Sequence, residues 1–274
     1  NRERETAFTK AEEKKSILII GGGPAGMEAA RVSALRGHDV TLVEKEDHLG
    51  GMYTWASVPE FKDDGKLLIK WYEHQMKELN VHVSLKDEIK ADDLRIKDAD
   101  VVICATGSHA FLPPIEGLNN AYTAVDVLKG EKHIDKHAVI IGGGLVGCEL
   151  AIWLAQQGKK TTIVEMADKL MSTGAPADMN IQMIMELLEH YHTDIHLNAK
   201  LTKVEEGKIF VNENGETKEI EAPSVIIALG YRSENSLYHN IMTIAKDIYN
   251  IGDSSHPKDI MEGIWDAYEL CSHL

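Results

Sequence analysis

Cysteine, aromatic residues and basic residues are all scarce in this sequence. Only three cysteines occur in 274 residues, and aromatic residues make up 6%. Cys104, Cys148 and Cys271 are widely spaced and odd in number, so they provide neither a disulfide framework nor a CxxC redox or metal pair. We therefore expect a cytoplasmic protein, and we expect no metal site, since no cysteine or carboxylate completes a ligand set with the scattered histidines.

The shortage of basic residues leaves a strongly acidic chain. Lys and Arg number 29 against 44 Asp and Glu, a formal net charge of −15. Such a surface repels nucleic acid and anionic membranes, so neither is expected as a partner. Apolar runs such as Ile17–Ile20 and Val225–Leu229 are also far shorter than the roughly 20 residues of a membrane helix, which favours a soluble protein.

The start of the chain is polar and does not begin with methionine. Residues 1–15 hold many charged side chains, and the first apolar run follows from Ser16. This pattern is typical of a linker, and we expect it to join the folded part to a longer polypeptide.

One segment of the sequence occurs twice. Residues 15–26 reappear as residues 136–147, an offset of 121 (142 − 21 for the first glycines), and the same offset pairs Glu44 with Glu165. A chance glycine cluster would not keep register over more than about thirty positions, so we predict two copies of one folding unit.

Each copy has the pattern strand, tight turn, helix, strand. In the first copy, a buried strand at Ile17–Ile20 is followed by a helix at Met27–Leu35 that ends at Gly37, and by a strand at Val40–Val43. The second copy predicts strands at Val139–Ile141 and Thr161–Val164 around a helix at Cys148–Gln157. The expected fold class is α/β, with two Rossmann-like dinucleotide-binding domains.

The remaining patterns set the expected domain boundaries. Ser108–Leu118 contains two prolines and is expected to cross into the second domain, and Ala222-Pro223 to cross back. Asn214-Gly215 predicts a hairpin turn, and a helix is expected from about Asp259. The expected organisation is a first domain of residues 16–110 plus 225–274 and a second domain of residues 111–224 inserted in it.

The glycine motif Gly21-x-Gly23-x-x-Gly26 lies between a strand and a helix, the setting in which it binds a dinucleotide. The first glycine permits the turn, the second lets the pyrophosphate approach the backbone, and the third lets the helix pack on the strand. The helix N-terminus supplies N–H groups to the phosphates, and Glu44 is placed to accept the ribose hydroxyls.

The second copy repeats this arrangement with Gly142, Gly144, Gly147 and Glu165. Two dinucleotide sites in one chain indicate two cofactors that exchange electrons face to face, and a flavin and a nicotinamide are the expected pair.

Four motifs carry a resemblance to a known family. They are Gly21–Gly26 with Glu44, Ala105–Gly107, Ala228–Gly230 and Ile251–Asp253. On these motifs the chain resembles flavoproteins of the glutathione-reductase-like fold, from about Ser16 onwards. The resemblance implies FAD in the first domain and NAD(P)H in the second, with Asp253 holding the ribityl chain or the pyrophosphate. The alternative for Asp253 is a turn or helix-cap residue.

The resemblance also implies the full set of binding residues. The implied FAD contacts are Gly21, Gly23, Pro24, Ala25, Gly26, Glu44, Lys45, Gly51, Met52, Ala105, Thr106, Gly107, Gly252, Asp253 and Ile260. The implied NAD contacts are Gly142, Gly144, Leu145, Val146, Gly147, Glu165, Met166 and Gly230. The helix at Ile260 would point its N-terminus at the flavin pyrimidine. No catalytic side chain is expected, because the cofactors carry hydride transfer.

Finer motifs are similar to the C-terminal half of multidomain enoate reductases, which include 2,4-dienoyl-CoA reductase, trimethylamine dehydrogenase and NADH:flavin oxidoreductases of the old yellow enzyme type. These motifs are Leu49–Met52, Ala124–Leu128, Gly142–Glu149 and Ala228–Tyr231. The resemblance implies a partner that this sequence lacks, an N-terminal barrel with FMN and a four-iron cluster. Electrons would pass from NADH through FAD to that barrel, which reduces an activated C=C bond.

NADH is favoured over NADPH, because Glu165 would repel a 2′-phosphate and Met166 to Asp168 offer no arginine to receive one; Lys169 is the nearest cation. Two other functions stay open. One is a self-sufficient NADH oxidase or ferredoxin reductase, and the other is a non-catalytic domain that holds ADP. A dithiol reductase is disfavoured, because no CxxC pair is present.

Overall fold

The computed structural model describes residues 9–172 and 178–274. Its contacts divide the chain into two compact units. Unit 1 extends as far as His109 and resumes from Arg232 to Leu274, and unit 2 extends from Ala110 to Tyr231. Strands β5 (Ser108–Ala110) and β14 (Tyr231–Ser233), where the chain passes from one unit to the other, pair with each other. Of the expected linker, residues 1–15, residues 1–8 lie outside the described residues.

Unit 1 is built around a five-stranded parallel sheet with the order β15-β4-β1-β2-β3. Its strands are β1 (Ser16–Ile20), β2 (Asp39–Glu44), β3 (His82–Leu85), β4 (Val101–Cys104) and β15 (Ile248–Asn250). Its helices are α1 (Pro24–Arg36), α2 (Met52–Ala56), η1 (Glu60–Lys62), α3 (Asp63–Glu78), α4 (Leu94–Asp98), α8 (Ser236–Ile241), η3 (Gly252–Ser254) and α9 (Ile260–His273).

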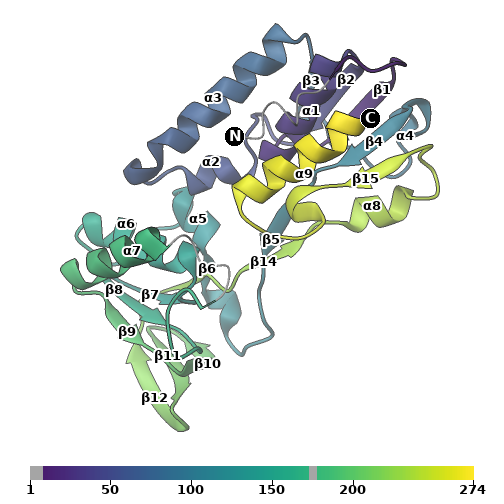
Figure 1. The fold of residues 1–274 in the computed structure, drawn as a ribbon. Helices are drawn as coiled ribbons and strands as arrows, with labels where there is room; N and C mark the ends of the chain where they lie inside the picture. The colour runs from purple at the N-terminus through teal and green to yellow at the C-terminus, as the bar shows by residue number, and fades with distance from the viewer. Residues whose placement is uncertain (1–8, 173–177) are drawn as a thin grey trace. The chain divides into compact units, whose positions relative to one another are not determined.

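Successive residues of β1 pack in two different apolar clusters, one on each face of this sheet. Ile17 and Ile19 pack with residues of α1, α3 and α9, which lie together on one face (Figure 1). Leu18 and Ile20 pack in a second cluster, with residues of α4 and α8. Because successive strand residues point to opposite faces, an unbroken apolar run is what a strand covered on both sides requires.

Unit 2 contains a five-stranded parallel sheet with the order β6-β13-β7-β8-β9 and a three-stranded antiparallel sheet, β10-β11-β12. The strands are β6 (Tyr122–Thr123), β7 (His137–Ile141), β8 (Lys160–Val164), β9 (Asp194–His196), β10 (Ala199–Glu205), β11 (Lys208–Glu213), β12 (Glu216–Glu221) and β13 (Ser224–Ile227). The helices are η2 (Leu118–Asn120), α5 (Ala124–Leu128), α6 (Leu145–Gln156) and α7 (Asp178–His190).

The two faces of the parallel sheet in unit 2 are covered differently. Ala138 and Ile140 pack with residues of α5, α6 and α7. Val139 and Ile141 pack instead against apolar residues of β10 and β11, so the small antiparallel sheet takes the place of a helix layer. The hairpin between β11 and β12 turns at Asn214 and Gly215, as the sequence predicts, with φ angles of 53° and 90°.

The predicted return to the first domain after Pro223 is wrong. Strand β13 pairs in parallel with β7, with Ser224 opposite Ala138, so residues 225–227 belong to the sheet of unit 2 and residues 228–230 to the loop that follows it in the same unit. β13 occupies the place beside β7 that β4 occupies beside β1. The sequence of Val225–Gly230, VIIALG, is similar to that of Val101–Gly107, VVICATG, because the two strands are equivalent and not because the chain returns to the first domain there.

Candidate functional site

The first glycine of the motif in unit 1 lies in a turn that only glycine fits. Gly21 has φ +112°, and a Cβ atom there would lie 2.2 Å from the carbonyl oxygen of Ala105. Its N–H donates to the carbonyl of Val43 at 2.8 Å, which closes the turn onto the end of β2. The turn therefore depends on close packing between the glycine loop and the Ala105–Gly107 segment.

The other two motif glycines have different surroundings. A Cβ on Gly26 would lie 1.9 Å from the carbonyl oxygen of Gly21, so this glycine lets α1 pack tightly on the turn. Around Gly23 no heavy atom lies within 4 Å of the Cβ position. Gly23 is also the N-cap of α1, and no side chain caps the helix there. The backbone is thus open at the start of α1, where Pro24 has no N–H and the N–H groups of the residues that follow it, from Ala25, can receive an anion.

Glu44 is held beside this opening by the backbone. Its Oε2 accepts the N–H of Gly22 at 2.7 Å and its Oε1 accepts the N–H of Glu46 at 2.9 Å, and the residue is 6% exposed. Each carboxylate oxygen has a second lone pair, so the group can still accept bonds from two ribose hydroxyls. The neighbouring Lys45 is exposed.

Two further predicted segments of unit 1 meet the glycine loop. Gly50 donates its N–H to the carbonyl of Gly22 at 2.9 Å, and a Cβ on Gly51 would lie 3.1 Å from Cα of Gly23. Gly51 is the N-cap of α2, so Met52 begins that helix beside the loop. A Cβ on Gly252 would lie 2.8 Å from Cβ of Ala25. The glycine loop of unit 1 is therefore in contact with three segments that are far apart in the sequence, at Gly50 and Gly51, at Ala105 and at Gly252.

Asp253 makes two hydrogen bonds inside unit 1. Its Oδ2 accepts from Oγ of Ser108 at 2.9 Å, and its Oδ1 accepts the N–H of Lys258 at 3.1 Å. The bond with Ser108 joins the Ile251–Asp253 motif to the segment after Gly107. The bond with the N–H of Lys258 has the form of a contact that stabilises a turn. Nearby, Thr106 donates its hydroxyl to the carbonyl of Glu234.

Sequence reasoning missed the residue that caps α9. The helix begins at Ile260, as expected, but the carboxylate of Asp259 accepts the N–H of Glu262 at 2.8 Å. This negative side chain offsets part of the positive end of the helix dipole that was expected to face the flavin. The spacing of Asp259 and Glu262 is that of an N-terminal capping pattern, which is a signal readable in the sequence.

Unit 2 repeats this arrangement. We call the glycine turn together with its backbone-bound glutamate, Gly21–Gly26 with Glu44 or Gly142–Gly147 with Glu165, a glycine cradle. Gly142 has φ +110°, and a Cβ there would lie 2.3 Å from the carbonyl oxygen of Ala228. A Cβ on Gly147 would lie 2.0 Å from the carbonyl of Gly142, whereas the Cβ position on Gly144 has no atom within 4 Å. Gly144 is the N-cap of α6, and no side chain caps that helix, whose first turn contains Leu145 and Val146.

The acidic residue of unit 2 is held in the same manner. Glu165 accepts the N–H of Gly143 at 2.6 Å and the N–H of Ala167 at 2.8 Å. Beside it, the side chain of Met166 is 70% exposed. Gly230, with φ +88°, follows Ala228 in the loop after β13. All the predicted NAD residues therefore lie in unit 2, and all the predicted FAD residues lie in unit 1.

The three cysteines are packing residues. Cys104, Cys148 and Cys271 are all free and buried, each in a different apolar cluster. Burial raises the pKa of each thiol to about 12. A thiol with so high a pKa does not form the thiolate that disulfide exchange requires.

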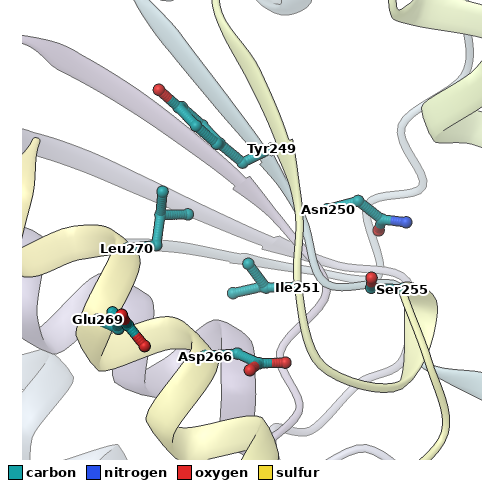
Figure 2. A pocket seen from close by; sticks show the side chains of 7 residues that line it. All are labelled: Tyr249, Asn250, Ile251, Ser255, Asp266, Glu269 and Leu270. Carbon is teal, nitrogen blue, oxygen red and sulfur yellow. The ribbon is translucent and has the colours of Figure 1, made fainter.

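A hollow of about 390 Å³ in unit 1 has none of the predicted FAD contacts in its lining. It is lined by Tyr249, Asn250, Ile251, Ser255, Asp266, Glu269 and Leu270, between β15 and α9 (Figure 2).

Within residues 9–172 and 178–274, no group of three or more His, Cys, Asp and Glu side chains is arranged to hold a metal ion. No helix in that part of the chain has the length and apolar character to cross a membrane.

The chain is similar to several reductases. It is 42% identical to cinnamate reductase of Clostridium sporogenes over 274 residues. This alignment covers 100% of this chain and 41% of the relative. It is 34% identical to NADH oxidase of Thermoanaerobacter brockii, with 97% of this chain and 42% of the relative covered. The expected oxidoreductase character and the resemblance to enoate reductases are confirmed by these matches. The chain spans about two fifths of the length of these relatives.

Solved structures agree with the fold. A 2-naphthoyl-CoA reductase in complex with 2-naphthoyl-CoA superposes with a TM-score of 0.92 and 30% identity, over 98% of this chain and 41% of that one. Histamine dehydrogenase from Rhizobium sp. 4-9 shares the fold, with a TM-score of 0.85 and 22% identity over 97% of this chain and 44% of that one. The model of the pyridine nucleotide-disulphide oxidoreductase family matches residues 15–264. The chain, with its duplicated glycine cradle, therefore belongs to the pyridine nucleotide-disulphide oxidoreductase family, whose members use FAD and NAD(P)H.

Proposed function

We propose that this chain transfers hydride from NADH to FAD, with FAD in unit 1 and NADH in unit 2. The single observation that supports this assignment is the duplicated cradle. In each unit the middle glycine of the motif, Gly23 or Gly144, faces open space at the start of a helix that no side chain caps. Two such places suit the pyrophosphates of two dinucleotides.

The residues of unit 1 fit FAD. Gly23 and the first turn of α1 would receive the pyrophosphate, and Glu44 would accept the ribose hydroxyls of the ADP half. Gly51, Met52, Thr106 and Asp253 would contact the rest of the cofactor. FAD supplies the redox chemistry when bound, because its ring system accepts the hydride. This chain's own residues bind and orient the two nucleotides.

The residues of unit 2 favour NADH. Glu165 places a carboxylate where the adenosine ribose would lie, and a 2′-phosphate there would be repelled. The following residue, Met166, is exposed and uncharged, so it offers no partner to a phosphate. NADH, which has a free 2′-hydroxyl, instead gives Glu165 a hydrogen-bond donor.

We further propose that the electrons leave for another domain of a longer polypeptide. The relatives, which include enzymes named cinnamate reductase and bilirubin reductase, are more than twice as long as the matched part. The proposed acceptor is an N-terminal barrel with FMN and a four-iron cluster, and the proposed final substrate is an activated C=C bond, as the name cinnamate reductase suggests for that relative.

One measurement tests the first step. The purified chain is reconstituted with FAD, and its absorbance near the flavin maximum is recorded before and after anaerobic addition of NADH. Bleaching by NADH, with a much weaker response to NADPH, supports the proposal. A Gly144→Ala variant serves as the control, since it should retain FAD and lose bleaching at low NADH.

The other outcomes separate the competing functions. Rapid turnover with dioxygen or ferredoxin by this chain alone indicates a self-sufficient oxidase or ferredoxin reductase. A protein that binds ADP but neither retains FAD nor bleaches would be a nucleotide-holding domain, and the proposed hydride transfer would then be wrong.

A further inference from the structure

The outer face of α9 presents large apolar side chains to solvent. Met261 is 48% exposed and Trp265 is 60% exposed. The two residues are four positions apart on the helix, so they lie on the same side, one turn from each other. The opposite side of α9 is buried against the core through Ala267 and Cys271. Together Met261 and Trp265 form a small apolar patch on the outer face of α9.

The same side of the helix continues into the hollow of Figure 2. Glu269 is one turn beyond Trp265, and it lines the hollow together with Asp266. Ile251 and Leu270 form the apolar part of the lining between β15 and α9, and the carboxylates of Asp266 and Glu269 lie on the helix (Figure 2). In the described part of the chain, neither carboxylate has an ion-pair or hydrogen-bond partner. The hollow is therefore suited to a positively charged side chain.

The length of the relatives indicates what covers this face. Cinnamate reductase and NADH oxidase each extend well beyond the segment that this chain matches. The matched segment is 41% of the length of cinnamate reductase and 42% of the length of NADH oxidase. A domain joined in the same polypeptide sits at a high effective concentration, so a modest surface is enough to hold it. Met261, Trp265 and the acidic hollow together make such a surface, with an aromatic anchor next to a charged recess.

We propose that the outer face of α9 is the docking surface for the further domain of this polypeptide. That domain presents apolar side chains to Met261 and Trp265, and it places a lysine or arginine in the hollow beside Asp266 and Glu269. The inference rests on the proposed function only in that such a further domain exists. It does not depend on which nucleotide either unit binds.

Hydroxyl-radical footprinting tests the proposal. The 274-residue chain and the full-length product of its gene are oxidised in parallel, and the rate at each side chain is read by mass spectrometry. Oxidation of Met261 and Trp265 should be about fivefold slower in the full-length protein, as expected for side chains at the core of an interface. Met242 and Met179, which are 50% and 83% exposed, serve as internal controls and should react equally in both.

A charge variant tests the role of the hollow. In the full-length protein, the double change Asp266→Asn and Glu269→Gln should restore most of the oxidation at Met261 and Trp265. A matched change at an exposed glutamate of α7, Glu189→Gln, should leave their protection intact. If both carboxylates can be removed without effect, the recess does not receive a basic side chain and that part of the proposal is wrong.

Other outcomes overturn the whole proposal. Equal oxidation in the two proteins would show that no domain covers α9. Protection that appears in the 274-residue chain alone, and grows with its concentration, would assign the face to a second copy. Bleaching of FAD by NADH is measured separately, so failure of hydride transfer and failure of docking are distinguishable.

Discussion

Glu44 and Glu165 lie 121 positions apart, at the ends of strands in two different sheets. Each carboxylate nevertheless accepts hydrogen bonds from two backbone N–H groups, and these occupy equivalent positions in the two units. One comes from the glycine 22 positions earlier, Gly22 or Gly143, at 2.7 and 2.6 Å. The other comes from the residue two positions later, at 2.9 and 2.8 Å. The backbone therefore fixes each carboxylate at the end of its strand, beside an open glycine turn.

Replacing a middle glycine should separate binding from folding. Gly23 has φ −72° and open space around its Cβ position, so Gly23→Ala should leave the melting temperature nearly unchanged. The added methyl group occupies the approach to the backbone, and we expect FAD affinity to fall about tenfold or more, which is about 1.4 kcal/mol. Flavin content after gel filtration and calorimetric titration with FAD measure this change.

The matched control for that change is Gly21→Ala. This substitution meets the Ala105 carbonyl at 2.2 Å and a positive φ, so it should lower the melting temperature by several degrees. Equal losses of stability in Gly21→Ala and Gly23→Ala would contradict the prediction.

Removing the charge of Glu165 should alter the choice of nucleotide. Glu165→Gln removes the repulsion of a 2′-phosphate and weakens the acceptor for the ribose hydroxyls. We expect the affinity for NADH to fall about tenfold while the affinity for NADPH falls less. Dissociation constants from fluorescence titration give the ratio, and Glu44→Gln, the equivalent change in unit 1, should leave that ratio as it is in the unchanged protein.

A buried ion pair in α1 should matter strongly for stability. Arg31 donates two hydrogen bonds to Glu28, both of 2.8 Å, and the hydroxyl of Tyr72 donates a third at 3.2 Å. Glu28 is 3% exposed, so Glu28→Ala leaves the arginine without its partner and should lower the free energy of unfolding by about 3 kcal/mol. Urea denaturation measures it. Tyr72→Phe should cost about 1 kcal/mol, and a loss below that for Glu28→Ala would refute the assigned role.

The three cysteine thiols should be unreactive towards thiol reagents in the folded protein. The pKa of the Cys104 thiol is raised to about 12 by burial, so Ellman's reagent at pH 8 should label none of the three thiols before unfolding and all of them afterwards. Rapid labelling of any one of them in the native state would be inconsistent with the packing described.

The same raised pKa fixes the sign of the pH effect. Folding favours the neutral thiol, so this stabilisation is complete below the unfolded pKa near 9 and is lost as the pH rises towards 12. The advantage of the unchanged protein over Cys104→Ala should therefore shrink by about 2 kcal/mol between pH 8 and pH 10.5.

The sequence allowed the local structure of both repeats to be predicted. Short apolar runs bounded by glycines identify β1, β7 and the helices that follow them, because the signal lies within a few residues. The helices begin slightly earlier than expected, at Pro24 and Leu145, since the motif glycines themselves are the N-caps. The glycines and acidic residues of the two motifs could be located for the same reason, because each motif lies within about 25 residues of sequence.

The features that sequence reasoning missed depend on distant partners. The assignment of β13 failed because a buried apolar strand can join either sheet, and only its pairing with β7 decides between them. The contact of Tyr72 with Glu28 joins α3 to α1 across 44 positions, and no local pattern indicates it. The cap at Asp259, in contrast, had a readable signal that was overlooked.

The two cradles have one consequence for how the molecule handles small metabolites. Each offers the same set of groups, an open glycine backbone and a tethered carboxylate, and in the proposed function both sets would receive the adenosine diphosphate half that FAD and NADH share. Free ADP, which is that half alone, should thus compete at either unit. In the proposed function, discrimination between FAD and NADH would then come from the side chains that receive their rings.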